Sequence, residues 1–301
     1  MKKQPKVAII TTTYTQGNKI LRLLKSIEKH IKYENYRVYF LDDSGKRVFE
    51  NKIKKEFPKV RVFSNKENLG YAISNNILIK KSIKEYNPDY ILHLDDDSKI
   101  ISDLWLSKFI KIAEKTEGGI FGCRVYHDNM SNQWIAKKDK IKFYNKKENF
   151  KKDKLYLKTQ EVNDIIGCCF LIKREVINDI GLLDEGFFPA YGEDTDFCYR
   201  AKKKGHKLIY IGELSIVHSG HSSADTLDKR FLWYLKKRNS IRLEWKHLSL
   251  LKIFYFTLMH FCSTLKGNKK LFLSNVGLLI KAYIYNFKKM NEIKTLRKDL
   301  K

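Results

Sequence analysis

The chain has 301 residues, which is enough to bury the hydrophobic core of roughly one to three domains. Hydrophobic residues make up 43% of the sequence, and this excludes a disordered or collagen-like chain, which lacks the apolar side chains that offset chain entropy. Lys and Arg number 60 against 34 Asp and Glu, a net charge of +26. This excess favours an anionic partner such as nucleic acid, anionic lipid or a nucleotide, or it reflects a solvated lysine-rich surface.

The five cysteines lack the paired spacing of metal fingers or redox motifs. We therefore expect buried, reduced thiols and a cytosolic compartment. Residues 1–6 lead directly into a strand-like segment without the apolar stretch of a signal peptide, so secretion is not expected.

The first half of the sequence alternates predicted strands and helices. Runs of β-branched and apolar residues predict four strands, at Val7–Thr13, Tyr36–Leu41, Val60–Phe63 and Tyr90–Leu94. Apolar residues at helical spacing predict helices between them, including one at Gly70–Tyr86, and Ser102 is expected to cap another. Repeated units of this kind predict an α/β fold, a mostly parallel sheet with helices on both faces.

Polar residues follow each of the four predicted strands, where ligands bind in parallel sheets. In chain order these residues are Thr13 and Tyr14, Asp42 and Asp43, Asn65 and Asn68, and Asp95–Asp97. Acidic or amide residues are ordinary turn formers, but four consecutive strand ends predict a nucleotide or metal site. Neither a GxGxxG nor a GxxxxGK[ST] motif is present, which excludes dinucleotide-dehydrogenase and P-loop sites.

Three consecutive aspartates, Asp95–Asp97, follow the fourth strand directly. Adjacent carboxylates repel one another unless a cation compensates their charge. Because side chains alternate along an extended chain, Asp95 and Asp97 are expected to face one way and Asp96 the other. The alternatives are a solvated acidic turn and a site for Mg²⁺ or Mn²⁺, and the apolar strand before the aspartates favours the metal.

A second acidic segment lies further along the chain. Asp164–Lys173 is predicted to be a buried strand, with Gly167 placed for a close backbone approach. After a loop rich in aromatic residues, Glu193 and Asp194 are predicted to begin a helix that runs to Gly205. These acids either cap the helix through its dipole or place a carboxylate base beside a sugar hydroxyl.

Two histidines follow the next predicted strand, Lys207–Ile211, in a loop rich in Ser and Gly. A lone histidine is usually a structural hydrogen-bonding group. Since His218 and His221 follow an acidic segment together, at least one of them is a candidate metal ligand.

These segments occur in a characteristic order. They are Thr11–Tyr14, Asp42–Ser44, Asn68–Tyr71 with Asn75 and Asn76, Leu94–Asp97, Leu183–Glu185 through Phe188, Tyr191–Asp194, and His218. The ordered set resembles the family 2 glycosyltransferases with a GT-A (Rossmann-like) fold, and is most similar to bacterial rhamnosyl- and galactofuranosyltransferases. The resemblance covers roughly residues 5 to 245. Such families usually carry Asn after the first Tyr, where this sequence has Thr15.

The resemblance implies a role for each matching position. Asp194 is the implied general base, and Glu193, Asp184 and Tyr191 would orient the acceptor or the base. Mn²⁺ or Mg²⁺ would be bound by Asp97, His218 and Asp95. The implied donor pocket consists of Thr11, Thr13, Tyr14, Asp42, Asn68, Gly70, Asn75, Asp95, Asp96 and Gly167.

The implied reaction is a metal-dependent, inverting transfer of a sugar. The donor would be a nucleoside-diphosphate-sugar, with UDP or dTDP as the nucleotide. The acceptor would be a saccharide hydroxyl, lipid-linked, in cell-surface polysaccharide synthesis. An ordinary carboxylate is ionised at pH 7, so Asp194 needs no large pKa shift to act as a base.

The C-terminal part, from Leu227 onward, is predicted to be helical, aromatic and basic. Leu248–Leu265 and Leu271–Phe287 approach spanning length, but their charged residues argue against transmembrane helices. We expect them to lie on the inner face of the cell membrane, against anionic lipid, as part of a cytoplasmic peripheral protein. The alternative is a helical subdomain that packs on itself or forms a homo-oligomer. Arg238 and Asn239 are candidates to reach a diphosphate.

The predicted organisation is a catalytic domain at residues 1–225, with a nucleotide-binding half at 1–126 and an acceptor-side half at 127–225, followed by a helical region at 226–301. Two other classes of function stay open. A metal-dependent nuclease or nucleotidyltransferase would use the aspartates and the basic, aromatic stretch Lys137–Lys158, but leaves the other motifs unexplained, so nucleic acid is not the expected partner. A non-catalytic saccharide- or membrane-binding protein is the other.

Overall fold

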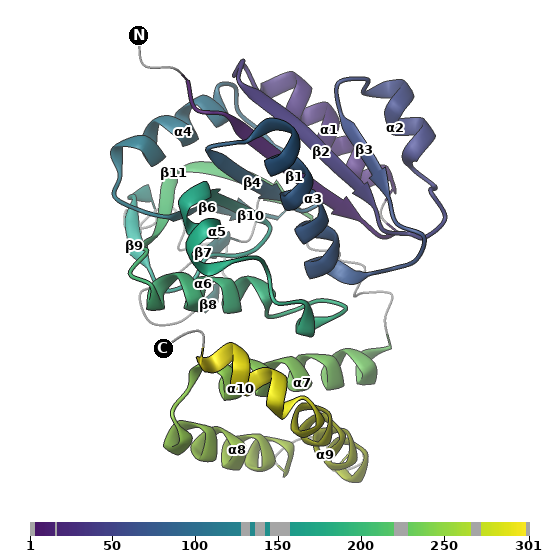
Figure 1. The fold of residues 1–301 in the computed structure, drawn as a ribbon, viewed down its shortest axis with the longest axis vertical. Coiled ribbons are helices and arrows are strands. Elements are labelled where there is room, and N and C mark those ends of the chain that lie inside the picture. Colours follow the sequence, from purple (N-terminus) through teal and green to yellow (C-terminus); the bar gives the residue numbers. More distant parts are fainter. Residues whose placement is uncertain are drawn as a thin grey trace. The chain divides into compact units, whose positions relative to one another are not determined.

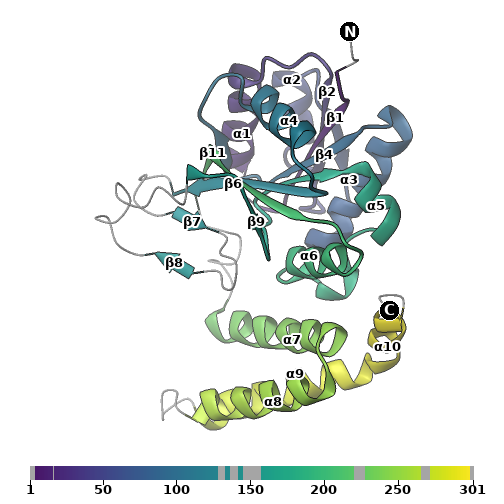
Figure 2. The same cartoon turned by 90° about the vertical axis from the view of Figure 1, so that its left-hand side faces the viewer.

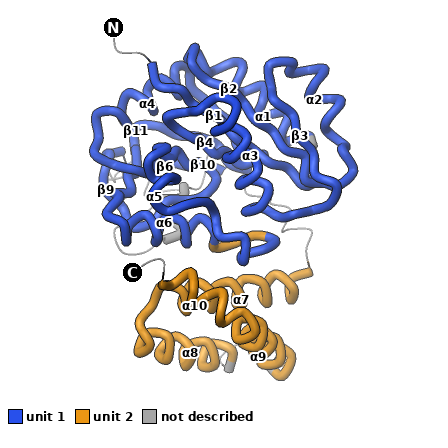
Figure 3. Tube along the Cα trace, in the orientation of Figure 1, with its two compact units in different colours: residues 1–189, 193–223 blue, residues 190–192, 224–301 orange. Residues whose placement is uncertain are grey.

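The computed structural model describes residues 4–15, 17–127, 133–135, 142–144, 157–219, 228–265 and 272–298. The chain divides into two compact units, coloured separately in Figure 3. Unit 1 comprises Met1–Pro189 and Glu193–Ser223, and unit 2 comprises Ala190–Gly192 and Ala224–Lys301. His221 and most of Lys137–Lys158 lie outside the described residues.

Unit 1 is built on one central sheet (Figures 1 and 2). Its main strands run in the order β3-β2-β1-β4-β10-β6-β11-β5. Their bounds are β1 Val7–Thr13, β2 Tyr36–Asp42, β3 Arg61–Ser64, β4 Tyr90–Leu94, β5 Ser98–Ile100, β6 Ile120–Tyr126, β10 Cys169–Lys173 and β11 Leu208–His218. Three short strands, β7 Gln133–Ile135, β8 Lys142–Tyr144 and β9 Gln160–Val162, extend it.

The first four strands pair in parallel, as do β6 and β11. Strand β10 lies antiparallel between β4 and β6, and β5 pairs antiparallel with β11. The predicted α/β fold with a mostly parallel sheet is therefore confirmed, and its carboxyl edge is where the acidic segments gather.

Helices cover both faces of the sheet because alternate strand residues point to opposite sides. Val7 and Ile9 belong to the core beneath α1 Gly17–His30, α2 Glu50–Glu56 and α4 Trp105–Lys115. Ala8 and Ile10 belong to the core beneath α3 Gly70–Tyr86, α5 Arg174–Ile180 and α6 Glu193–Lys203. The short 3₁₀ helix η2 Glu185–Phe187 precedes α6.

Several element boundaries differ by a residue or two from the sequence expectation, and three further differences have a clear physical reason. The helix expected after Ser102 begins at Trp105, and its N-cap is Leu104 in a left-handed conformation, so Ser102 is not the cap. The strand expected at 164–173 begins only at Cys169, because 164–168 form a loop in which the amide of Gly167 donates to Asp194 of α6. Strand β11 continues past Ile211 to His218 because its second half pairs with β5.

Unit 2 is helical, with α7 Lys229–His247, α8 Leu250–Leu265, α9 Phe272–Lys288 and α10 Met290–Lys298. Its small apolar core joins Tyr234 and Ile241 of α7 to Leu279 and Ala282 of α9. Asp228 caps α7 by accepting hydrogen bonds from the amides of the first turn. Among the described residues, no helix has both the length and the apolarity needed to cross a bilayer.

Candidate active site

Strand pairing brings the aspartates and His218 together. The chain leaves β4 at Leu94, turns through Asp95–Asp97 and enters β5 at Ser98, with the amide of Ser98 donating to the oxygen of Asp95 (3.0 Å). Strand β11 pairs antiparallel with β5, and the register sets His218 opposite Ser98. The imidazole consequently lies beside the aspartate turn, although 120 residues separate Ser98 from His218.

The three side chains form a compact ligand set. His218 Nε2 lies 2.9 Å from Asp97 Oδ1 and 3.4 Å from Asp95 Oδ2. One ligand atom from each residue lies within 4.8 Å of the others. Asp96 points away, and its carboxylate accepts a hydrogen bond from the hydroxyl of Thr13, as the expected alternation requires.

The electrostatics of this set suit a cation. Burial alone would lower the pKa of His218, but hydrogen bonds and charge from Asp95 and Asp97 raise it to about 10. Burial would raise the pKa of Asp95, but the hydrogen bond from His218 and the charges of His93 and His218 hold it below its usual value. Two carboxylates and one imidazole are donors that Mn²⁺ and Mg²⁺ accept in proteins, so the residues fit the predicted metal.

Basic groups of α1 adjoin Asp97. Lys19 Nζ lies 3.8 Å from Asp97 Oδ2. Arg22 donates to the backbone oxygen of Asp97 (3.4 Å) and to the hydroxyl of Ser219. Positive charge at this edge of the sheet complements a diphosphate.

Two aromatic residues that the sequence analysis did not select connect the metal ligands to the second acidic segment. The hydroxyl of Tyr71 lies 3.2 Å from the His93 ring nitrogens and 3.5 Å from Asp95 Oδ1. His93 Nδ1 lies 2.9 Å from the backbone oxygen of Gly167. The only signal for His93 in the sequence is that a histidine interrupts the mainly apolar run YILHL, which predicts a strand and no site residue.

Asp194 is held by backbone amides at the start of α6. Its Oδ2 accepts from Gly167 N (3.1 Å) and its Oδ1 from Thr195 N (2.7 Å). A Cβ at Gly167 would lie 2.9 Å from Asp194 Oδ2, so the close backbone approach expected at this glycine is made to Asp194. Burial raises the pKa of Asp194. The pKa of its neighbour Asp164 is also raised, by burial and by the charge of Asp194.

Glu193 differs from Asp194 in its surroundings. It is buried, and its Oε2 has no hydrogen-bond partner within the described part of the chain. Burial, followed by the charge of Asp194, raises its pKa well above the usual value. The pKa values of both carboxyl groups are raised, but Asp194 also accepts backbone hydrogen bonds from Gly167 and Thr195 that favour its carboxylate form. Two adjacent carboxyl groups in such different environments are typical of acid–base sites.

Helix α3 fastens the loop that precedes α6. Asn76 donates to the oxygen of Leu183 (3.0 Å) and to the carboxylate of Glu185 (3.0 Å), and Tyr71 N donates to Pro189 O (2.8 Å). Asp184 caps η2 by accepting from Gly186 N (2.9 Å). This carboxylate thus shapes the loop, whatever further part it plays toward an acceptor.

Within unit 2, Asn239 of α7 holds the next stretch of that loop. Its Nδ2 donates to the oxygens of Ala190 (2.8 Å) and Tyr191 (2.7 Å), and its Oδ1 accepts from Arg238 Nε (2.9 Å). Tyr191 has a φ of 81°, a left-handed conformation that costs free energy and persists only where the surrounding structure enforces it. Lys236 Nζ stacks over the Tyr191 ring at 5.3 Å. The side-chain NH₂ group of Asn239, which was a candidate to reach a diphosphate, therefore donates to this loop.

The predicted donor-pocket residues lie at the carboxyl ends of β1 and β2 and at the start of α3. Asp42 accepts from Ser44 N (3.0 Å) and Phe49 N (2.9 Å), and Asn68 accepts from Gly70 N (2.9 Å). Tyr14 is exposed, whereas Thr11 is fully buried. Asn75 is buried, and its Nδ2 donates to Tyr71 O (2.9 Å).

Asp43, one of the strand-end residues that predict a nucleotide or metal site but have no individual role assigned from the sequence, holds the start of α3. Its Oδ1 accepts from Asn65 Nδ2 (2.7 Å) and Leu69 N (3.0 Å), and its Oδ2 accepts from Gly70 N (3.0 Å). Gly70 has a φ of 79°, and a Cβ there would lie 2.8 Å from Pro189 O, so glycine is required.

A sheet with acidic and histidine side chains gathered at its carboxyl edge, and helices on both faces, defines a GT-A glycosyltransferase fold. The family model described as "Glycosyl transferase family 2" matches residues 8–181, more than half of the chain. The chain therefore belongs to glycosyl transferase family 2.

Individual similarities are more distant. The low-salt glycan biosynthesis hexosyltransferase Agl10 of Haloferax volcanii is 27% identical over 165 residues, which is 52% of this chain and 49% of that protein. The chain spans about half or less of the length of the curated relatives it matches.

Two solved structures share the fold. GalNAc-T7, solved with UDP, GalNAc and Mn²⁺, matches with a TM-score of 0.59 at 16% identity over 81% of this chain and 48% of its own. The mannosyltransferase PcManGT from Pyrobaculum calidifontis, in complex with GDP-Man and Mn²⁺, matches with a TM-score of 0.56 at 13% identity. The match covers 96% of this chain and 76% of PcManGT. At these identities the similarity establishes the fold.

Proposed function

We propose that the protein transfers a sugar from a nucleoside-diphosphate-sugar, with UDP or dTDP as the nucleotide, to a hydroxyl of a saccharide acceptor, with inversion at the anomeric carbon. One observation carries the proposal. A chain of close polar contacts joins the candidate metal ligands to the acidic segment. The Tyr71 hydroxyl lies 3.5 Å from Asp95 Oδ1 and 3.2 Å from the His93 ring nitrogens. His93 Nδ1 lies 2.9 Å from Gly167 O, and Gly167 N donates to Asp194 Oδ2 (3.1 Å). Metal-dependent transfer needs this combination of a diphosphate site and a base.

The chemistry follows from the roles of the side chains. Asp194 accepts the proton of the acceptor hydroxyl while that oxygen attacks the anomeric carbon. The bond from that carbon to the diphosphate oxygen breaks, and the nucleoside diphosphate leaves with the electron pair. Lys19 and Arg22 stabilise the negative charge that grows on the diphosphate. Neutral Glu193 is available to donate a hydrogen bond that orients the acceptor.

Asp95, Asp97 and His218 would hold Mn²⁺ or Mg²⁺, which supplies further charge neutralisation to the leaving diphosphate. The Mn²⁺ and the nucleotides in the structures of GalNAc-T7 and PcManGT support a metal and a nucleotide-sugar here. Asp184 and Tyr191, from the loop before α6, complete the proposed acceptor side.

The proposed acceptor is a lipid-linked saccharide of cell-surface polysaccharide synthesis, met at the inner face of the membrane. The basic and aromatic helices of unit 2 support this setting, and they also leave room for a homo-oligomer through α8 and α9. The name of the relative Agl10, a low-salt glycan biosynthesis hexosyltransferase, supports a role in glycan synthesis.

The test is a donor panel. The protein is incubated with UDP-, dTDP- and GDP-sugars, with Mn²⁺, Mg²⁺ or EDTA, and release of nucleoside diphosphate is measured with and without saccharide acceptors. Metal-dependent release from a UDP- or dTDP-sugar that rises with acceptor supports the proposal. Turnover that EDTA leaves unchanged contradicts the metal, and a product of retained anomeric configuration contradicts the single displacement.

A further inference from the structure

Helix α8 presents apolar side chains outward and polar side chains inward. His260 and Thr264 are buried on the inward side and Thr257 is half-buried there, whereas Leu251 is 84% and Phe254 is 65% exposed. The outward set is Leu250, Leu251, Phe254, Tyr255, Leu258 and Phe261. A surface helix of a protein that meets only water has the opposite polarity. The outward face of α8 therefore requires an apolar contact.

The polar inward side is fixed by specific hydrogen bonds and contacts. His260 Nε2 lies 3.3 Å from Glu244 Oε1 of α7, and His260 Nδ1 lies 3.0 Å from the hydroxyl of Tyr283 of α9. Thr264 Oγ1 donates to His260 O (2.8 Å). Rotating the helix to hide its apolar side would break these contacts and leave buried polar groups without partners. The inverted polarity is thus a built feature of unit 2.

Helix α9, which packs against α8, extends the apolar surface. Leu273 and Phe287 are 82% and 70% exposed, and Ile280 and Ile284 are exposed between them at helical spacing. We name these four residues and the outward set of α8 the α8–α9 face. The apolar area that several large side chains expose together marks an interaction site.

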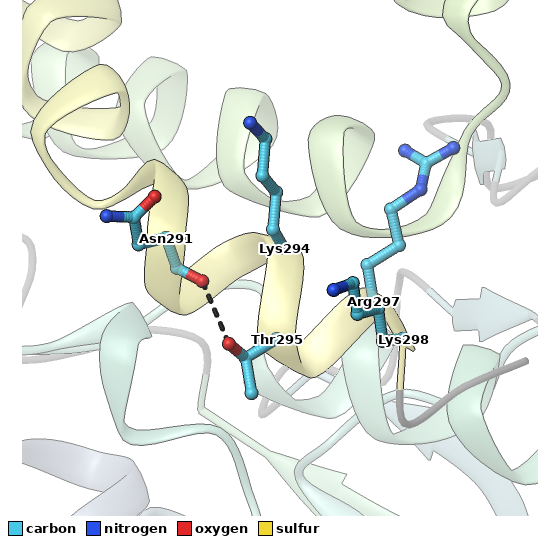
Figure 4. A pocket seen from close by; sticks show the side chains of 5 residues that line it. All are labelled: Asn291, Lys294, Thr295, Arg297 and Lys298. Atoms are coloured by element: carbon cyan, nitrogen blue, oxygen red, sulfur yellow. Dashed lines mark hydrogen bonds between the residues drawn. The ribbon is translucent and has the colours of Figure 1, made fainter.

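Charge around the α8–α9 face indicates the kind of partner. Neither helix contains Asp or Glu, and Lys252, Lys281 and Lys288 are exposed on them. On α10, Lys294, Arg297 and Lys298 line a hollow of about 450 Å³, together with Asn291 and Thr295 (Figure 4). A second copy of the same face would bring lysine against lysine. A surface with an apolar interior and anionic headgroups complements both features.

We propose that the α8–α9 face docks into the interfacial region of an anionic lipid bilayer, with both helices in the membrane plane. At 16 and 17 residues these helices are shorter than the roughly 20 residues needed to span the hydrocarbon core. This proposal deepens the proposed function. It rests on that function only for the statement that the membrane is where a lipid-linked acceptor is met.

The first experiment measures binding of the full chain to vesicles of phosphatidylcholine alone or mixed with phosphatidylglycerol, by flotation. Binding to the anionic vesicles that weakens with salt is expected. The triple variant Leu251→Ser, Phe254→Ser and Leu258→Ser keeps the charge and is expected to weaken binding at least about tenfold, because it removes inserted apolar area. The double variant Val48→Ser and Leu157→Ser is the matched control, since both side chains are exposed apolar groups of unit 1.

A second measurement reports the position of α8 directly. Cys262 is exposed on α8, whereas the other four cysteines are buried, so a maleimide dye sensitive to polarity labels this helix selectively. Its emission is expected to shift to the blue when anionic vesicles are added. The proposal is overturned if the chain floats with vesicles and the dye does not respond, or if the triple variant floats like the control.

A further outcome identifies the competing occupant. Light scattering could instead find that the parent chain is a dimer and the triple variant a monomer, while anionic vesicles bind neither of them. In that case the α8–α9 face joins two copies and the lipid proposal fails. Because vesicle binding is measured without donor or acceptor, it succeeds or fails independently of nucleoside diphosphate release. Circular dichroism of the triple variant confirms that it folds.

Discussion

Glu193 and Asp194 are neighbours whose carboxyl groups lie in different surroundings, since Asp194 accepts two backbone hydrogen bonds and Glu193 Oε2 has no hydrogen-bond partner among the described residues. Because Asp194 is the proposed base, Asp194→Asn is expected to reduce transfer by about a hundredfold to ten-thousandfold. Glu193→Gln keeps a neutral, hydrogen-bonding side chain and is expected to stay within about tenfold of the parent. Steady-state kinetics and nucleotide binding by calorimetry test both, with nucleotide affinity expected to be unchanged. A larger loss in Glu193→Gln than in Asp194→Asn would reverse the two roles.

The carboxyl groups of Asp164 and Asp194 lie close enough that the Asp194 charge raises the pKa of Asp164, so we expect Asp164 to act on the pKa of Asp194 in turn. Burial raises the pKa of Asp194, so transfer is lost as the pH falls through that raised pKa. In Asp164→Asn the negative neighbour is gone and an oxygen that accepts from Thr195 remains, so the pKa of Asp194 falls. The acid limb of the rate profile is expected to move to lower pH, on the order of one pH unit. A limb that stays in place or moves upward contradicts the coupling.

Single residues differ in how far their sequence context revealed them. The segment Asp95–Asp97 could be predicted as a site because three like charges follow an apolar strand. Tyr71 and His93 did not, since one follows a turn motif and the other sits inside a strand, and only the fold brings them together. Gly167 was predicted to make a close approach, but its partner Asp194, 27 residues away, was not readable from spacing.

At the scale of elements, α7 holds Ala190 and Tyr191, which precede Asp194 in the chain, through the side-chain amide of Asn239. In Asn239→Ala the loop at Ala190 and Tyr191 loses two hydrogen bonds, so the residues leading to Asp194 are less firmly placed. We expect kcat to fall about tenfold or more, since small displacements of reacting groups are costly. The control is Asn286→Ala, which removes two hydrogen bonds of α9, to Arg238 O and Ala282 O, without touching the loop.

Both Asn variants should lose similar thermal stability, which separates positioning from folding. If Asn286→Ala slows transfer as much as Asn239→Ala does, the effect is general loosening of unit 2.

Runs of apolar residues predicted β1 and β4, and apolar residues at helical spacing predicted α3, all at their observed bounds. It could not predict that β10 inserts antiparallel between β4 and β6, because pairing partners depend on tertiary packing rather than on local periodicity.

At the scale of the whole molecule, the proposed metal site would connect distant parts of unit 1. Asp95 and Asp97 follow β4, and His218 ends β11, so a cation bound by these three residues would link two segments far apart in the sequence. An ion that binds only the folded state stabilises it by mass action, by about 2.7 kcal/mol at a concentration of about a hundred times its Kd. Adding Mn²⁺ is therefore expected to raise the midpoint of thermal unfolding of the full chain.

The size of this effect depends on pH. Because the pKa of His218 is raised to about 10 without the metal, binding must displace a proton, and the Mn²⁺-induced shift should grow as the pH rises from neutral. His218→Ala removes both the proton and one ligand, so it should show a smaller shift with little dependence on pH. Lys19→Ala is the control, because Lys19 lies 3.8 Å from Asp97 but offers a positive charge rather than a ligand. Scanning calorimetry at two pH values decides the matter: an equal Mn²⁺ shift in His218→Ala would mean that the ion binds elsewhere in the chain.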